Sequence, residues 1–325
     1  MKVSIVIPAH NAAATLRECL AACTAQRYTD CEIVVVDDGS TDATPEIARE
    51  FPVTLIRQPK RGPAAARNVG ARAATGAIVA FTDSDCRPHP NWVERLVSGI
   101  DDRFCAAGGS YGIANRDEPL ARIIHAEIAA RHSSFKESID FAGSYNFAVR
   151  RTVFESLHGF DEEFTAASGE DNDFCCRLID EGHAIAYVAD ACVDHYHPAR
   201  LWPYLRTQAR HGFWRMKLYR KHPRRSRGDQ YAGPFDLVAP AFALLLVVQP
   251  VLWLFPYIIV VQVVALLGAL LLAGFRLGTA WNIRKQERGL PFGYCFAMLI
   301  LRDCARGLGM VRGLWHFVAR RRTTA

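Results

Sequence analysis

Residues 78–86 read Ile-Val-Ala-Phe-Thr-Asp-Ser-Asp-Cys, an apolar run of strand length that ends in two aspartates. Alternate side chains of a strand point to the same face, so Asp83 and Asp85 leave the strand on one side. Where the strand ends, the chain can bend and both carboxylates can reach one ion. Hard divalent cations prefer such oxygen ligands and keep coordination positions open for substrate phosphates. An isolated Asp-x-Asp is more often a surface turn, so the surrounding chain must decide between these interpretations.

The pattern of a buried strand followed by polar residues recurs upstream of this stretch. We expect strands over residues 3–8, 32–38, 53–57 and 77–82, with a helix after each of the first three. Asn11 is expected to cap the first of these helices. Apolar strands that alternate with helices predict an α/β fold with a doubly wound, mostly parallel sheet. Ligands bind at the carboxyl ends of strands in such sheets. Five residues lie at these ends: Pro8, Asp37, Asp38, Asp83 and Asp85.

Two later motifs add candidate functional residues. The segment Gly169-Glu170-Asp171-Asn172-Asp173 begins a predicted helix, where acidic residues complement the helix dipole. That structural interpretation explains Asp171 less well if the helix start faces the same cleft as Asp85. His195 and His197 follow a predicted strand over 183–189 and would share one face. A lone histidine is usually structural, but one placed beside Asp85 would complete a metal site.

The formal net charge of +6 is unevenly distributed along the chain. Residues 1–199 contain 19 Lys/Arg and 29 Asp/Glu, whereas residues 200–228 contain ten Lys/Arg and no acid. Residues 236–325 contain ten Lys/Arg and three Asp/Glu. A basic excess beside the most apolar part of a chain is typical of a membrane surface. Nucleic-acid binding through residues 200–228 is the competing interpretation, and the adjoining apolar stretch argues against it.

The back of the chain predicts a membrane anchor. Residues 237–275 contain no Asp, Glu, Lys, Arg or His, and one membrane span needs about 20 residues. We therefore expect a two-helix hairpin with its turn near 253–256, both basic flanks being cytoplasmic. A single long tilted helix would place one basic flank outside. For residues 290–318 we favour an amphipathic helix at the interface, because Arg302, Asp303 and Arg306 interrupt the apolar run, with a third span as the alternative.

The ten cysteines include no Cys-x-x-Cys pair. Met1-Lys2 leads directly into a predicted strand, without a secretory signal peptide before it. We therefore expect a reducing, cytoplasmic environment for the front of the chain, without a disulfide framework.

Five motifs, taken in order, resemble the family 2 glycosyltransferases with a GT-A fold. They are Val-Ser-Ile-Val-Ile-Pro-Ala-His-Asn (3–11), Val-Val-Val-Asp-Asp-Gly-Ser-Thr-Asp (34–42), Ala-Arg-Asn-Val-Gly (66–70), Asp-Ser-Asp (83–85) and Gly-Glu-Asp-Asn-Asp-Phe (169–174). The resemblance covers residues 1–199 and implies a Rossmann-like, nucleotide-binding catalytic domain there. A basic and aromatic segment (200–235), the transmembrane hairpin (236–275) and a basic cytoplasmic tail (276–325) would follow it.

The resemblance also implies roles for individual residues. Asp38 would bind the nucleoside of a nucleotide-diphosphate sugar, with Pro8 and Ala9 lining that pocket. Asp83 would lie near the ribose and the metal. Asp85 would hold a divalent cation, Mn2+ or Mg2+, which His195 would help to bind.

The remaining candidates concern the reaction and the donor. The resemblance implies that Asp171 is the catalytic base, with Glu170 orienting Asp171 or the acceptor. Arg67 would face the donor phosphates, its alternative being a solvated helix charge. Asn146 is a further candidate for contact with the nucleotide sugar.

The implied activity is that of an inverting, hexosyltransferase-type enzyme that moves one sugar to an acceptor hydroxyl. Processive synthases of the family carry Gln-x-x-Arg-Trp after the base, whereas residues 208–214 read Gln-Ala-Arg-His-Gly-Phe-Trp, which favours a single addition. The acceptor would be a lipid-linked or cell-envelope glycan intermediate. The location would be the inner (plasma) membrane, multi-pass, with the catalytic domain cytoplasmic. Two alternatives remain. One is a catalytically silent, membrane-tethered scaffold that binds nucleotide sugars, and the other is a polyprenyl-phosphate glycosyltransferase.

Overall fold

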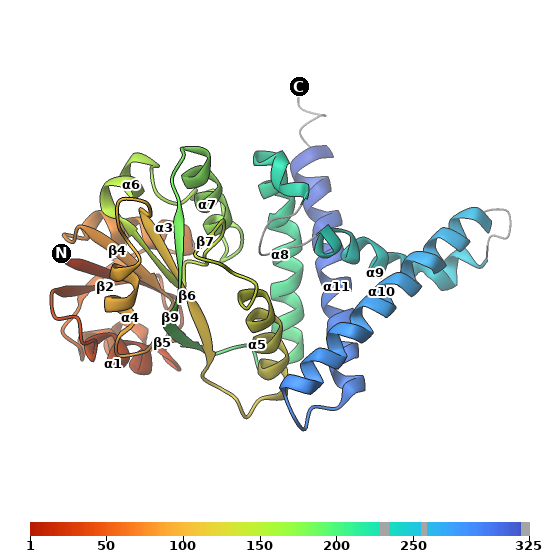
Figure 1. Ribbon diagram of the computed structural model, residues 1–325, viewed down its shortest axis with the longest axis horizontal. Helices are drawn as coiled ribbons and strands as arrows, with labels where there is room; N and C mark the ends of the chain where they lie inside the picture. Colours follow the sequence, from red (N-terminus) through yellow and green to blue (C-terminus); the bar gives the residue numbers. More distant parts are fainter. Residues whose placement is uncertain (228–233, 255–258, 320–325) are drawn as a thin grey trace. The chain divides into compact units, whose positions relative to one another are not determined.

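The computed structural model describes residues 1–227, 234–254 and 259–319 (Figure 1). The chain divides into two compact units. The first unit contains residues 1–116 and 128–197, and the second contains residues 117–127 and 198–325. Helix α5 (Pro119–His132) contributes its first part to the second unit and its last turn to the first.

A single mixed sheet forms the centre of the first unit. Its strands are β1 (Val3–Ala9), β2 (Cys31–Asp38), β3 (Thr54–Gln58), β4 (Ile78–Thr82), β5 (Cys86–Pro88), β6 (Ala106–Ile113), β7 (Ser138–Ile139), β8 (Asn146–Arg150) and β9 (Ile185–His195). The order is β3-β2-β1-β4-β8-β6-β9-β5, and β7 pairs with β9. Strands β1 to β4 are parallel, as expected for strands buried on both faces. Beyond β4 the sheet is mixed and not mostly parallel as expected: β6 and β9 are parallel, but β8 runs antiparallel to both of its neighbours and β5 runs antiparallel to β9.

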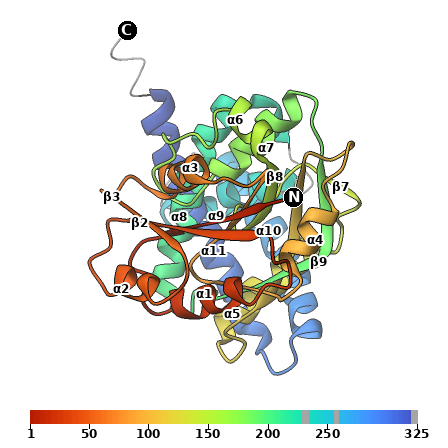
Figure 2. The ribbon, with the colours of Figure 1, turned by 90° about the vertical axis from the view of Figure 1, so that its left-hand side faces the viewer.

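Helices cover both faces of the sheet, as Figure 2 shows. One face carries α1 (Leu16–Thr24), α2 (Thr44–Arg49) and α4 (Trp92–Ser98), and the other carries α3 (Pro63–Ala73), α6 (Arg151–Ser156) and α7 (Glu170–Asp180). Leu16 and Leu20 of α1 join the core beneath β1. Helix α3 approaches the opposite face closely at Gly70, where a Cβ atom would lie 2.4 Å from Cγ1 of Val6. The doubly wound arrangement is therefore built by ordinary burial of apolar faces.

The expected helix cap at Asn11 is wrong. Helix α1 begins at Leu16, and its cap position is Thr15, which makes no side-chain cap hydrogen bond. Asn11 instead has a φ of 50°, and its side chain accepts the N–H of Thr41 over 2.9 Å. Asparagine tolerates this left-handed conformation better than most residues. Asn11 therefore ties the loop after β1 to the loop after β2.

The second unit consists of helices α8 (Leu201–Lys221), α9 (Pro234–Leu252), α10 (Ile259–Gln286) and α11 (Phe292–Leu314), with the first part of α5. A short 3-10 helix (Pro223–Arg227) follows α8, and a π-helical turn (Trp315–Ala319) follows α11. Helices α8 and α11 pack closely at glycines. A Cβ atom at Gly309 would lie 1.9 Å from the carbonyl oxygen of Ala209, and one at Gly212 would lie 2.0 Å from that of Arg306. Small residues allow helix backbones to approach in this way.

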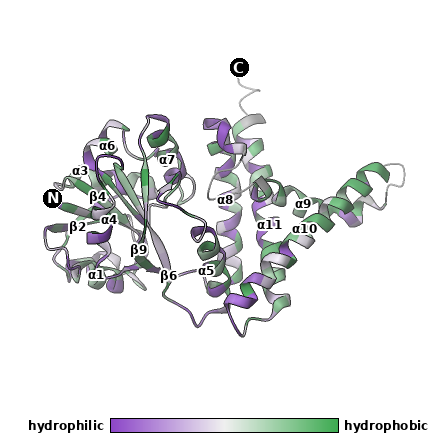
Figure 3. Cartoon of the chain, viewed as in Figure 1, coloured by the Kyte–Doolittle hydropathy of each residue, from purple (hydrophilic) through white to green (hydrophobic). Residues whose placement is uncertain are grey.

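Helices α9 and α10 carry most of the exposed apolar surface of the second unit, which Figure 3 shows in green. Among the described residues, one helix, α10, is long and apolar enough to cross a membrane, and residues 235–251 of α9 form a shorter apolar helix. A hairpin of two transmembrane helices is therefore not established. Helix α10 continues to Gln286, beyond the predicted end of the hairpin at residue 275. Part of the predicted turn, residues 255 and 256, lies outside the described residues. The same holds for residues 228–233 and 320–325.

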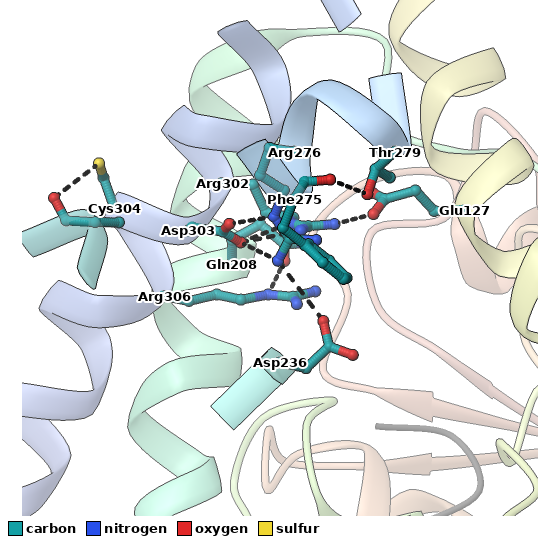
Figure 4. A network of polar contacts seen from close by, with 11 residues as sticks. Glu127, Gln208, Asp236, Phe275, Arg276, Thr279, Arg302, Asp303, Cys304 and Arg306 are labelled. Carbon is teal, nitrogen blue, oxygen red and sulfur yellow. Dashed lines mark hydrogen bonds and ion pairs between the residues drawn. The ribbon is translucent and has the colours of Figure 1, made fainter. Parts of the chain in front are cut away.

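Charged side chains from several helices converge inside the second unit (Figure 4). Arg276 Nε of α10 lies 2.6 Å from Asp303 Oδ2 of α11, and Arg302 NH2 lies 2.9 Å from Asp303 Oδ1. Arg302 also pairs with Glu127 of α5. The side chains of Arg302 and Asp303 are buried. Arg302 and Asp303 therefore face other helices of the unit, and the interfacial position expected for residues 290–318 stays a prediction.

Candidate active site

Asp38 lies at the carboxyl end of β2, where its carboxylate is held by backbone amides. Its Oδ1 accepts the N–H of Arg61 over 2.8 Å and the side-chain amide of Gln58 over 2.7 Å. Its Oδ2 accepts the N–H of Gly62 over 2.8 Å. The segment before α3 therefore fixes the orientation of Asp38. Pro8 and Ala9, at the end of the adjacent strand β1, are buried beside β2, with Ala9 paired to Asp37.

Asp37 has a structural role at the same strand end. Its carboxylate accepts Arg57 Nε over 2.9 Å and the N–H of Ser40 over 2.9 Å. Burial alone would raise the pKa of Asp37, but these hydrogen bonds outweigh burial and lower it. Asp37 thus stays ionised and closes the turn after β2.

Arg67 of α3 connects the end of β4 to the start of α7. Its NH2 lies 2.6 Å from Asp83 Oδ1, and its NH1 lies 2.9 Å from Glu170 Oε1. The other oxygen of Glu170 accepts the N–H of Ser168 over 2.7 Å. Because the guanidinium is buried and already pairs with two carboxylates, Arg67 is not the solvated helix charge that the sequence left open. It acts as a bridge between two predicted site residues.

Asp171 follows Glu170 in the first turn of α7. Its Oδ1 accepts the N–H of Asn172 over 2.8 Å. Burial raises the pKa of Asp171, while the charge of Arg67 acts in the opposite direction. Burial and the charge of Asp171 raise the pKa of Glu170 to about 7, again against Arg67. Two acids with raised pKa values beside one buried cation are typical of a site that handles protons.

Asp85 and His195 meet at the β5–β9 end of the sheet. His195 Nε2 lies 3.5 Å from Asp85 Oδ1, and 42% of the Asp85 side chain is exposed. Strand β9 ends at His195, so His195 and His197 do not share a strand face as expected. Their rings are nevertheless close, with Nδ1 atoms 3.1 Å apart. The structure thus brings the second aspartate of Asp-Ser-Asp together with the histidine that the sequence indicated.

The side-chain amide of Asn146 uses its hydrogen-bond donors inside the protein and not toward a ligand. Its side-chain NH2 donates to the carbonyl oxygens of Ser110 and Ala191, both over 2.8 Å, and its Oδ1 accepts Trp92 Nε1 over 2.7 Å. Both donors of the amide are therefore used inside the protein. We correct the prediction for Asn146: it joins β8 to β6 and β9 and supports the sheet beneath the site.

Residues 4–157 match the sequence profile described as Glycosyl transferase family 2. Glycosyltransferase AglE of Haloferax volcanii is 36% identical over 214 residues, which cover 61% of this chain and 67% of that protein. The chain belongs to glycosyl transferase family 2. Family membership makes the protein an enzyme that transfers a sugar from a nucleotide sugar, which confirms the predicted family and that the protein is a glycosyltransferase.

Two solved structures resemble this family 2 glycosyltransferase in fold. The mannosyltransferase PcManGT from Pyrobaculum calidifontis, in complex with GDP-Man and Mn2+, has a TM-score of 0.61 at 24% identity and covers 97% of this chain and 88% of that chain. TarS 1–349 of S. aureus in complex with UDP-GlcNAc has a TM-score of 0.53 at 18% identity, covering 97% and 92%. At these identities the likeness shows the GT-A-like fold alone.

Several further side chains lie around the glycosyltransferase site, and none of them was a predicted site residue. His10 Nδ1 lies 2.9 Å from the carbonyl oxygen of Asp38, and its Nε2 lies 2.9 Å from Lys60 Nζ. Tyr111 and Tyr145 stack with ring centroids 4.0 Å apart, and Tyr111 stands edge-on to His195 at 5.6 Å. His10 follows Pro8 and Ala9 directly, which is the one signal that could have indicated it. The stacked tyrosines come from two distant segments and leave no local signal.

Proposed function

We propose that the protein transfers one sugar from a nucleotide-diphosphate sugar to an acceptor hydroxyl in a single displacement that inverts the anomeric centre. Asp171 is the catalytic base, and Asp38, Pro8 and Ala9 form the nucleoside end of the donor site. Asp83, Asp85 and His195 form its diphosphate and metal end. Arg67 and Glu170 are positioning residues that hold these parts together.

The contact of Arg67 with both Asp83 and Glu170 carries this proposal. Asp83 ends the strand that leads to Asp85, and Glu170 immediately precedes Asp171. One buried cation therefore fixes the proposed base relative to the proposed diphosphate end of the donor site. Such positioning is a large part of what an enzyme contributes to a reaction between two bound substrates.

The reaction requires one proton acceptor and no covalent nucleophile. The acceptor oxygen forms a bond to the anomeric carbon as the bond from that carbon to the diphosphate oxygen breaks. The hydroxyl proton passes to the carboxylate of Asp171, and the nucleoside diphosphate leaves with the bonding electrons. Because Arg67 favours the ionised form of Asp171 against burial, it helps to keep the base ready to accept a proton.

The residues at the diphosphate end fit a divalent cation. Asp85 supplies a half-exposed carboxylate oxygen 3.5 Å from the imidazole nitrogen of His195, and such oxygen and nitrogen ligands suit Mn2+. The solved structure of PcManGT is a complex with GDP-Man and Mn2+, which supports a cation in the related fold. When bound, the cation would neutralise charge on the leaving diphosphate. Asp85 and His195 would hold it, with Asp83 beside them.

The second unit supports the proposed acceptor and the proposed location. The exposed apolar side chains of α9 and α10, together with the basic residues of α8, support attachment to a membrane. We infer a multi-pass protein of the inner (plasma) membrane with its catalytic unit on the cytoplasmic side. A lipid-linked or cell-envelope glycan intermediate is the acceptor that would meet the site there.

Donor binding and turnover by the purified protein in detergent test the proposal. UDP-, GDP- and dTDP-sugars are each supplied with Mn2+, Mg2+ or a chelator. We expect one donor to bind and to be slowly hydrolysed only with metal, and Asp171→Asn to abolish hydrolysis while binding persists. The matched control is Asp180→Asn, at the other end of α7. Binding without hydrolysis by the unaltered protein would favour the scaffold alternative, and no binding under any condition would refute the proposed site.

A further inference from the structure

The paired strands β5 and β9 have two faces. One face carries His195 of the proposed donor site, and the other carries no proposed donor-site residue. Cys86 pairs with His195, and Arg87 pairs with Asp194. Neighbouring residues of a strand point to opposite faces, so Asp194 points away from the side that carries His195. The N–H of His89 donates to the carbonyl oxygen of Cys192 over 3.0 Å, which places the residue after β5 beside β9. This face brings together His89, Cys192 and Asp194.

The ligand atoms of these three side chains are close enough for one metal ion. Nε2 of His89 lies 3.3 Å from Oδ1 of Asp194, and one ligand atom from each residue lies within 4.8 Å of the other two. In a tetrahedral zinc site the ligand atoms lie about 2.0 to 2.3 Å from the metal, so they are separated by roughly 3.3 to 3.8 Å. A small movement of Cys192 is therefore enough to close the site.

We propose that His89, Cys192 and Asp194 bind a zinc ion at the β5–β9 edge, separate from the metal of the donor site. A thiolate with an imidazole selects zinc over Mg2+ or Mn2+, which prefer oxygen ligands. All three residues are partly exposed, so water completes the fourth position. The thiolate and the carboxylate together balance the charge of the ion.

Neighbouring residues orient the ligands of this zinc site. Gly112 pairs with Asp194, and a Cβ atom at Gly112 would lie 1.9 Å from Asp194 Oδ1, so glycine makes room for the carboxylate. Arg87 lies 3.7 Å from the other oxygen of Asp194 and is itself held by Glu18 at 3.1 Å. The guanidinium therefore faces Oδ2 and leaves Oδ1 directed at His89. Partners of this kind commonly orient metal-binding carboxylates.

The zinc would join the short strand β5 to β9 directly behind the donor site. Strand β5 follows Asp85 immediately, and β9 ends at His195. The ion is therefore a structural brace for the ladder that carries two proposed ligands of the donor metal.

Cobalt substitution tests the zinc site independently of activity. Co2+ added to the metal-free, full-length protein in detergent should produce the absorbance of a thiolate-to-cobalt charge transfer, and Cys192→Ser should remove it. Cys86→Ser is the matched control, because Cys86 is the thiol of the other candidate metal group, with Asp85 and His195, and it is completely buried. The absorbance should persist in that control.

A second variant keeps the test decisive if Cys192→Ser does not fold. His89 has a 44% exposed side chain, so His89→Gln should leave the fold intact and weaken Co2+ binding by at least about tenfold. Loss of the charge-transfer absorbance in Cys192→Ser together with weaker binding in His89→Gln supports the site, and His89→Gln alone decides if Cys192→Ser does not fold. Absorbance that survives Cys192→Ser unchanged, an unaltered affinity in His89→Gln, or no absorbance in the unaltered protein overturns it. Donor binding is measured in parallel, so a failed zinc site is distinguishable from a failed donor site.

Discussion

Arg67 and Glu170 form an ion pair of 2.9 Å between side chains that are each 2% exposed. They lie 103 positions apart in the sequence, on α3 and at the first residue of α7. A buried pair contributes little net stability compared with apolar residues, but breaking it leaves an uncompensated charge. The pair therefore makes the position of the proposed catalytic base depend on one side chain of α3.

Replacing Arg67 by glutamine should destabilise the catalytic unit strongly. At a pH well above 7, where Glu170 is ionised, this carboxylate would lose its cation while remaining buried, at a cost of about 3 to 5 kcal/mol. Thermal unfolding of the purified protein measures the loss as a lower midpoint. Arg72→Gln, an exposed position on the same helix, is the control and should change stability by no more than about 0.5 kcal/mol. Equal midpoints for the two variants would contradict the bridging role of Arg67.

The stability of the catalytic unit should fall as the pH rises from about 4.5 to about 7. The pKa of Glu170 is raised from 4.5 to about 7 in the folded protein, so the folded protein keeps a proton that the unfolded chain releases. The unfolded state then binds fewer protons, and stability decreases with pH in this window.

Glu170→Gln removes this titration and provides the comparison. Its unfolding midpoint, measured across the same pH range, should decline less than that of the unaltered protein. Parallel curves for the two proteins would mean that Glu170 ionises normally, so that burial does not control it.

The sequence predicted the parallel half of the sheet and its functional ends because those strands are continuous apolar runs followed directly by aspartates. It placed Asp38, Asp83 and Asp85 at the strand ends, where the structure has them. The role of Asn146 was not predictable, because its partners come from β6, β9 and Trp92. The sequence around an asparagine does not reveal whether the hydrogen bonds of its side-chain amide are all made by distant backbone groups.

Asp85→Asn and His195→Gln should each weaken metal-dependent donor binding. Removing a residue that hydrogen-bonds to a metal ligand typically lowers the metal affinity about 10- to 100-fold, and removing the ligand itself should lower it at least as much. Titration of Mn2+ in the presence of a donor measures the shift in midpoint. Asp102→Asn, an exposed residue, is the control and should not shift it. Variants with unchanged Mn2+ midpoints would remove Asp85 and His195 from the metal site.

The packing of the helical unit was harder to predict, because the presence of a charged residue in the sequence does not show whether its side chain is buried. Arg302 and Asp303 interrupt an apolar run, which favours a surface helix when the sequence is considered alone. Their partners Arg276 and Glu127 lie far away in the sequence. Pairing with such distant residues is what allows charges to be buried among helices.

Asp303→Asn should therefore destabilise the helical unit more than any change of an exposed charge. Arg276 and Arg302 both point at Asp303 (Figure 4), and both are buried. Asparagine would leave two buried cations without their shared anion, at a cost of about 3 to 5 kcal/mol. The measurement is the unfolding midpoint in detergent, with Arg288→Gln, an exposed side chain, as control. Because Glu127 still pairs with Arg302, we expect the double variant Glu127→Gln/Asp303→Asn to lose more than Asp303→Asn alone. If the two variants lost the same stability, Glu127 would contribute nothing to the network.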